Sequence, residues 1–134
     1  MKIKIIISWI LRLAAAVILL QTLYFKFTAA PESVAIFSKL GIEPWGRIGT
    51  GIAELIAAVL LLIPRTVVYG ALLGIGIMLG AIVSHIAVIG IQSDNDGGQL
   101  FILAWVVFAC CAILLLMHKK EIAAIIKKQS VNIL

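Results

Sequence analysis

Four long apolar runs constrain what this chain of 134 residues can fold into more than any other feature. A helix that crosses about 30 Å of hydrocarbon needs roughly 20 apolar residues. The runs that qualify, or nearly do, are Ile5–Phe27, Ile48–Ile63, Val67–Ile91 and Leu100–Met117. The second run is short, so we expect it either to begin nearer Trp45 or to thin the bilayer locally. The sequence predicts an all-α, integral membrane, antiparallel four-helix bundle, with residues 1–134 forming a single domain.

The composition supports a membrane protein and excludes other classes. Apolar residues make up 63% of the chain, which is too much for a globular domain to cover with polar surface in water. The net charge of +5 comes from Lys and Arg placed at the chain ends and beside the apolar runs, which suits a membrane surface. The sequence lacks the clustered Arg and stacked aromatic residues of a nucleic-acid reader. The predicted partner is therefore the lipid bilayer and not nucleic acid.

The basic residues are distributed unequally between the two sides of the predicted bundle. Seven fall on the side that holds both termini: Lys2, Lys4, Arg65, Lys119, Lys120, Lys127 and Lys128. Lys39 and Arg47 fall on the other side, with Lys26 at its boundary. The second loop on that side, Gln92–Gln99, contains acidic residues and no basic one. Because loops rich in Lys and Arg stay in the cytoplasm, we expect a multi-pass inner (cytoplasmic) membrane protein with cytoplasmic N- and C-termini.

Two segments outside the spans are also predicted to be helical. Pro31 suits the first turn of a helix and Gly41 its end, and apolar residues at helical spacing lie between them. The first outer loop is therefore predicted to form a short interfacial helix. The tail, residues 118–134, mixes isoleucines with lysines in an amphipathic pattern, so we expect it to lie on the cytoplasmic surface.

Ionisable side chains inside an apolar span are costly, so each one is a candidate functional residue. Glu54, His85 and Gln21 each lie about six residues from the outer end of their span, which places all three roughly 9 Å below the outer surface. Thr50 shares a helical stripe with Glu54, and Lys26 lies at the outer boundary of the first span. These five residues form the predicted polar pocket.

Glu54 and His85 allow two interpretations. They could form a buried hydrogen-bonded pair that fixes helix packing. They could instead handle protons beside a small cavity open to the outer side, because imidazole and a desolvated carboxylate can both exchange protons near neutral pH. The sequence slightly favours the second interpretation. One His and one Glu fall short of the three or four ligands of a typical metal site, so no metal is predicted.

Arg12, Arg47 and Arg65 are interpreted as structural or snorkelling residues. Arg12 lies seven residues from the inner end of its span, so its long side chain can reach most of the way to the surface. On this first span Gln21 occupies one helical stripe, while Arg12 and Lys26 occupy another, roughly 140 to 180° away. Both stripes cannot face the bundle axis, and periodicity leaves the choice between them open.

Several motifs, in this order and spacing, resemble the DoxX-like family of small four-helix membrane proteins. They are Gly51-Ile-Ala-Glu54-Leu55 opening the second span, Leu61-Leu-Ile-Pro64-Arg65 closing it, Tyr69-Gly-Ala-Leu and Met78-Leu-Gly-Ala81 with His85 on the third, and Lys26 ending the first. The resemblance covers approximately Ile5 to Lys120.

The resemblance implies a fold and a location more firmly than an activity. The family is named after a subunit associated with a thiosulfate:quinone oxidoreductase, which implies a quinone- or lipophile-binding accessory subunit of a membrane redox complex rather than a stand-alone enzyme. Quinone is then the candidate cofactor. A distant similarity to a receptor-assembly chaperone implies a non-catalytic alternative, partnered by another membrane protein.

Three further expectations complete the sequence-based hypotheses. A small proton-coupled transporter is the third functional hypothesis, because a lone carboxylate such as Glu54 inside a span could respond to protons. A second copy of the chain is a further candidate partner, since four short helices enclose little space. Cys110 and Cys111 are adjacent within an apolar run and are interpreted as packing residues, not as a thiol relay.

Overall fold

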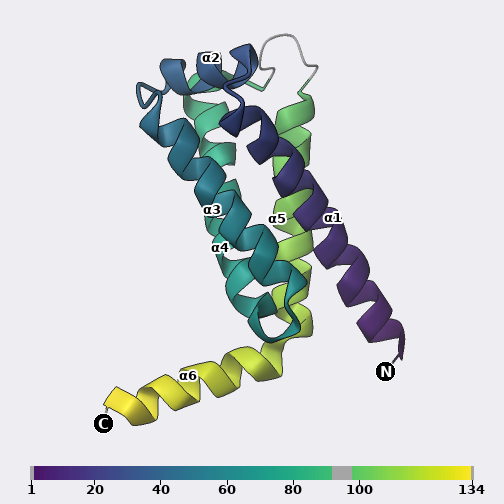
Figure 1. The fold of residues 1–134 in the computed structure, drawn as a ribbon. Coiled ribbons are helices and arrows are strands. Elements are labelled where there is room, and N and C mark those ends of the chain that lie inside the picture. Colours follow the sequence, from purple (N-terminus) through teal and green to yellow (C-terminus); the bar gives the residue numbers. More distant parts are fainter. Residues whose placement is uncertain (1, 92–97, 134) are drawn as a thin grey trace.

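The computed structural model describes residues 2–91 and 98–133, and its four long helices lie side by side (Figure 1). The long helices are α1 (Lys2–Phe27), α3 (Trp45–Leu62), α4 (Val67–Ser84) and α5 (Gln99–Met117). The shorter elements are α2 (Pro31–Lys39), the 3-10 turn η1 (Pro64–Thr66), the π-helical turn η2 (His85–Ile89) and α6 (Lys119–Ile133). The described residues contain no strand, so the predicted all-α fold is confirmed.

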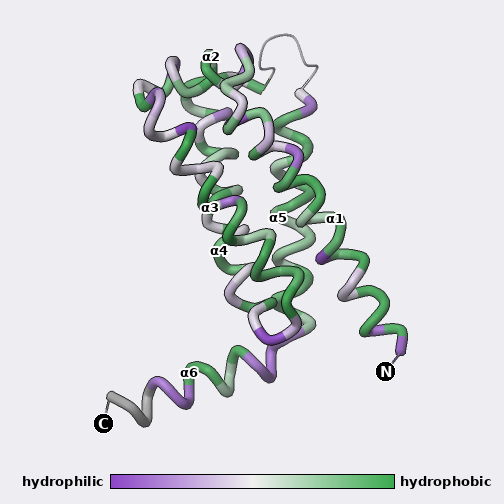
Figure 2. The backbone as a smooth tube through the Cα atoms, viewed as in Figure 1, coloured by the Kyte–Doolittle hydropathy of each residue, from purple (hydrophilic) through white to green (hydrophobic). Residues whose placement is uncertain are grey.

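Each long helix packs against two others and runs antiparallel to both. Helix α1 lies between α3 and α5, and α4 lies between the same two helices on the other side. All four segments are long and apolar enough to cross a membrane, the third being α4 together with η1 and η2. Figure 2 shows the apolar character running along these helices, with most hydrophilic residues at their ends and on α6 and a few within α1 and α3. This confirms the predicted four-helix membrane bundle.

Small residues bring the four helices close together. The fully or almost fully buried alanines of the core come from three helices: Ala15, Ala16, Ala57, Ala58 and Ala71. A Cβ added to Gly70 would lie 2.7 Å from the backbone nitrogen of Leu61, and one added to Gly74 would lie 2.8 Å from Sγ of Cys111. Close approach of this kind is how transmembrane helices gain packing contacts without a hydrophobic driving force.

The predicted helix in the first outer loop is present as α2. Pro31 occupies its first turn, and Gly41 follows its end with a φ of +76°, which a glycine adopts without steric cost. Helix α2 lies across the end of the bundle opposite the beginning of α1 (Figure 1). The chain therefore covers one end of its own bundle with a short helix.

The observed spans differ from the predicted ranges at their ends. The second begins at Trp45 instead of Ile48, which is the first of the two alternatives that its short apolar run left open. The third ends at Ile89 instead of Ile91, because Gly90 turns the backbone to a φ of +89°. In the predicted acidic outer loop, residues 92–97 lie outside the described residues.

Helix α6 leaves the bundle on the side where α1 begins (Figure 1). None of its side chains from 119 to 129 is buried, and its half-buried positions include Ile122 and Ile125. Ile122, Ile125 and Ile126 are therefore not part of the core, and the position of this helix on the cytoplasmic surface stays a prediction.

Candidate functional site

A cavity of about 910 Å³ lies between α1, α3 and α4 beneath α2. Most of the side chains in its wall are apolar, and the start of α5 contributes to it as well. Its polar or ionisable members are Thr22, Lys26, Glu32, Ser33, Thr50, Glu54, Ser84, His85 and Gln99. Sites for small organic ligands measure about 300 to 1,000 Å³. The cavity is thus large enough for an organic molecule and not just for a water or an ion.

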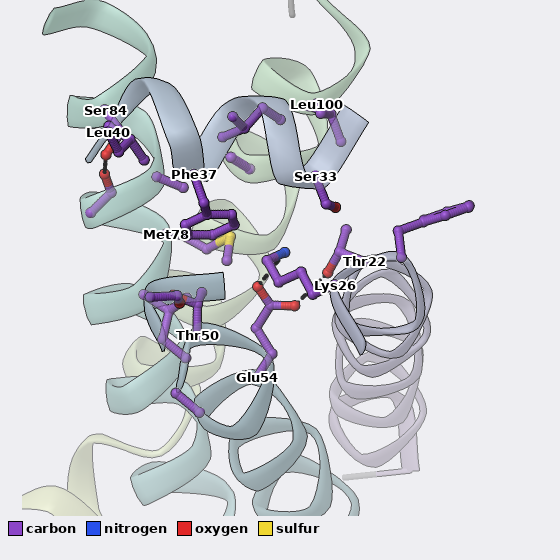
Figure 3. Close-up of a pocket in the computed structure, with 18 of the residues that line it drawn as sticks. Thr22, Lys26, Ser33, Phe37, Leu40, Thr50, Glu54, Met78, Ser84 and Leu100 are labelled. Carbon is purple, nitrogen blue, oxygen red and sulfur yellow. Dashed lines mark hydrogen bonds and ion pairs between the residues drawn. The ribbon is translucent and has the colours of Figure 1, made fainter. Parts of the chain in front are cut away.

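Glu54 is the most deeply buried ionisable residue in the cavity wall. Its side chain is 2% exposed, and Nζ of Lys26 lies 2.8 Å from its Oε1. The hydroxyl of Thr22 donates a hydrogen bond to Oε2 at 2.6 Å. Figure 3 shows Lys26 and Thr22 reaching from α1 to the carboxylate on α3. A carboxylate away from water is costly unless it is paired and hydrogen-bonded, and α1 supplies both partners.

Lys26 keeps hydrogen-bonding capacity that faces the cavity. An ammonium group has three N–H donors, and Glu54 is the acceptor that the described residues provide for them. The lysine side chain is 15% exposed and lines the cavity. Its remaining donors can therefore bind an oxygen atom of a ligand while Glu54 balances the positive charge.

Arg47 fixes the end of α1 against the beginning of α3. Its Nη1 donates to the backbone carbonyl of Lys26, and its Nε donates to Oε1 of Glu43 at 2.8 Å. The arginine is buried, with 7% of its surface exposed. Because Arg47 pairs with Glu43 and with the backbone carbonyl of Lys26, it holds the end of α1 without competing with the Lys26 ammonium group for Glu54.

His85 lines the same cavity, but its contacts are separate from those of Glu54. Its Nδ1 lies 3.0 Å from the carbonyl oxygen of Gly90, and since a carbonyl can only accept, Nδ1 carries a proton. The backbone carbonyl of His85 accepts from the N–H of Gly90 at 2.7 Å, which closes the π turn. The ring also packs edge-on against Phe101, with 5.6 Å between centroids. These contacts orient the imidazole and leave Nε2 as the nitrogen able to meet a ligand.

The cavity contains Glu54, His85, Lys26 and Thr50 of the predicted pocket, but not Gln21. The prediction for Gln21 is wrong because α1 turns the stripe containing Lys26 inward and leaves Gln21 exposed. A hydrogen-bonded pair of Glu54 and His85 is also wrong. The carboxylate binds two residues of α1, and the imidazole binds the backbone of its own helix end.

Arg12 contradicts the snorkelling interpretation. It is 4% exposed, its Nε donates to the carbonyl of Leu61 at 2.5 Å, and its guanidinium lies 3.7 Å from the ring centroid of Trp9. Its Nη2 is buried without a hydrogen-bond partner among the described residues. The physical reason is again the rotation of α1, which packs the Arg12 stripe against α3. Arg65 is exposed in the turn between α3 and α4, where a structural or snorkelling role remains a prediction.

Sequence reasoning missed Thr22 and the contribution of α2. Thr22 precedes Lys26 by one helical turn, so knowledge of the inward stripe would have identified it. Ser33 and Phe37 of α2 are buried and line the cavity, which was not foreseen for a helix predicted to lie in the interface. Figure 3 shows Phe37 above the Lys26–Glu54 pair. The spacing of Ser33 and Phe37 by one turn was the available signal for an inward face.

Comparison with known proteins assigns the chain to a family. A family model described as the DoxX-like family matches residues 10–114. No curated protein and no solved structure matches the chain. The family match covers most of the 134 residues, so the chain belongs to the DoxX-like family, in agreement with its sequence motifs.

Proposed function

We propose that this DoxX-like membrane protein binds a lipid-soluble small molecule with a polar oxygen-bearing head, of the quinone type. The observation that carries the proposal is the cavity of about 910 Å³ with a buried ion pair, Lys26 and Glu54, in its otherwise mostly apolar wall. The protein would hold this molecule as an accessory subunit of a membrane redox complex.

The apolar wall and the ion pair select for different parts of such a ligand. Burying an apolar ring or chain is worth about 25 cal/mol for each Å² removed from water. A carbonyl oxygen of the head can accept from the free N–H groups of Lys26, whose charge Glu54 balances. A plain hydrocarbon would leave these donors unsatisfied, and a small ion would not use the apolar wall. An amphiphile with a hydrogen-bond-accepting head uses both.

His85 offers a second polar contact from a different helix. Its Nδ1–H is held by Gly90, so in the neutral ring Nε2 is an acceptor and can receive a hydrogen bond from a hydroxyl of the reduced, quinol form of the head. A quinone-type head carries oxygens on opposite sides of its ring, and the walls contributed by α1 and by η2 each provide one polar group for it. This arrangement supports a quinone-type head over a simple alcohol or ester.

The accessory role rests on the family resemblance and on the thiols. Cys110 and Cys111 are adjacent and buried in α5, and Sγ of Cys111 packs beside Gly74. They therefore serve the packing of the bundle, and a partner protein would supply or receive the electrons. We also propose an inner-membrane orientation with both termini in the cytoplasm, because the basic side of the bundle is the side where α1 begins and α6 ends.

The test is mass spectrometry of small molecules extracted from the protein purified in mild detergent. The parent is compared with Lys26→Met, Glu54→Gln and His85→Ala. Lys39→Met is the matched control for the first variant, because Lys39 is exposed and lies outside the cavity. We expect one quinone-type molecule near stoichiometry in the parent and in the Lys39 variant, and its loss from the folded Lys26 and Glu54 variants.

Two results would contradict the proposal. Absence of any enriched molecule from the parent would favour the non-catalytic assembly role, in which Glu54→Gln largely keeps docking to a membrane partner. Equal amounts of the molecule in all variants would show that it is carried on the lipid-facing surface and not in the cavity. A proton-coupled transporter would instead lose pH-driven flux in the Glu54→Gln variant while releasing no stoichiometric ligand on extraction.

A further inference from the structure

Helices α3 and α4 are in close contact near the turn that joins them but are separated toward their other ends. Near the turn, a Cβ on Gly70 would lie 2.7 Å from the backbone nitrogen of Leu61, so the two backbones touch. Farther along, a Cβ placed on Gly49, Gly76 or Gly80 would meet no heavy atom of the described residues within 4 Å. The hairpin therefore opens away from its turn.

The three open glycines border the cavity. Gly49 on α3 and both Gly76 and Gly80 on α4 line it, and all three are exposed. Because each of them lines the cavity and has open space where a Cβ would lie, a larger side chain there would narrow this part of the cavity wall. The cavity consequently reaches the lateral surface of the bundle, in the gap between α3 and α4.

The surface around this opening belongs to the membrane-spanning part of the chain. Trp45 at the rim is 69% exposed, and Ile56 farther along α3 is 48% exposed. Large apolar side chains exposed on a transmembrane helix face lipid chains. The opening between α3 and α4 thus faces the bilayer, while the end of the cavity beneath α2 is covered by the buried residues Ser33 and Phe37.

We propose that the ligand enters and leaves the cavity sideways, directly from the bilayer, through the gap bordered by Gly49, Gly76 and Gly80. This inference rests on the proposed function and specifies its ligand further. The molecule is an amphiphile whose polar head reaches the Lys26–Glu54 pair and whose apolar part lies within the cavity once it has passed the gap.

Lateral entry predicts a kinetic effect that a change in the binding site itself would not produce. Bulk placed in the gap obstructs passage in both directions, so it slows association and dissociation together and leaves the equilibrium constant almost unchanged. The test variants are Gly76→Leu and Gly80→Leu, with Gly49→Leu as an independent obstruction from α3. Replacing an exposed glycine within a helix favours the helix, so these variants are expected to fold.

The matched control is Ala109→Leu, which adds a similar side chain to an exposed site on α5 outside the cavity. The proteins are placed in lipid nanodiscs and mixed with decylubiquinone in a stopped-flow instrument, and tryptophan fluorescence is followed because Trp45 lies at the rim. Quenching that Lys26→Met abolishes is assigned to the site. Trp45→Phe identifies the part of the signal that comes from the rim.

We expect both rate constants to fall at least about tenfold in the glycine variants, with the dissociation constant within about threefold of the parent value, and no change in the Ala109 control. Unchanged rates in all three glycine variants would refute lateral entry and leave the binding function standing. A weaker equilibrium constant with unchanged dissociation would also overturn it, because the added side chains would then not obstruct passage in both directions. No site-specific quenching in the parent would instead refute the proposed function.

Discussion

Lys26→Met should destabilise the bundle because it leaves the carboxylate of Glu54 buried without its cation. At the observed 2.8 Å, the attraction between the two charges is about 6 kcal/mol for an effective dielectric constant of about 20. Desolvation of both groups offsets part of this, and breaking a buried pair from one side typically costs about 3 to 5 kcal/mol. The hydrogen bond from Thr22 remains, so we expect a loss at the lower end of this range, about 3 kcal/mol.

The loss can be measured by reversible unfolding in mixed micelles with increasing dodecyl sulfate, followed by far-ultraviolet circular dichroism. Lys39→Met is the control, and as a surface change it should stay within about 0.5 kcal/mol of the parent. Glu54→Gln alone is measured as well, and the decisive sample is the double variant Lys26→Met with Glu54→Gln. It removes both charges, and we expect it to be more stable than the Lys26→Met single variant.

Two results would refute this reasoning. One is a loss below about 1 kcal/mol for Lys26→Met, which is the value of an exposed ion pair. The other is a double variant whose loss equals the sum of the two single losses, since independent residues add in this way. Either result would mean that Lys26 and Glu54 do not act as a buried pair.

Three further predictions concern packing, the second partner of the carboxylate, and orientation. Gly70→Ala should lower the free energy of unfolding by about 1 to 3 kcal/mol in the same titration, because it forces α3 and α4 apart. Gly76→Ala, at an open position, should raise it by up to about 1 kcal/mol. Equal shifts in the two variants would contradict a hairpin that opens away from its turn. Thr22→Val should lose about 1 kcal/mol of unfolding free energy because it removes the hydroxyl, whereas Thr22→Ser should lose almost none. Equal losses in the two variants would show that the hydroxyl contributes no stability. In intact cells, the cysteine of the Lys39→Cys variant should react with a membrane-impermeant maleimide, while the two buried native cysteines should not. Labelling that occurs only in permeabilised cells would reverse the proposed orientation.

Local sequence patterns were enough to predict the elements of the fold. The four spans follow from apolar runs of nearly bilayer length, and the short helix α2 follows from Pro31 and Gly41 at its two ends. These signals are local because a helix satisfies its own backbone hydrogen bonds, whatever its neighbours are. The start of α3 at Trp45 was one of the two alternatives for the second span. The end of the third span at Ile89 was not predicted, because Gly90 lies within an apolar run and hydropathy does not detect the positive φ that ends the helix there.

The candidate site could be predicted only in part. Glu54 and His85 were identified because an ionisable residue in a span is rare, and depth along the helix placed them at a similar level. Their partners were not identified correctly. Glu54 binds Lys26 and Thr22, and both lie on the stripe of α1 that periodicity could not choose over the stripe of Gln21.

The sequence by itself determined that this protein lies in a membrane, how many helices cross it and which residues are costly to bury there, since each of these depends on composition and on length along one segment. The tertiary structure alone decided which face of α1 turns inward, and with it the pairing of Lys26 with Glu54, the enclosure of Arg12 and the exposure of Gln21. In a bilayer the apolar faces of a helix are nearly equivalent, so hydropathy does not orient it. Its rotation is chosen by close packing between small residues and by the few polar groups that must find partners, and both depend on contacts between distant segments.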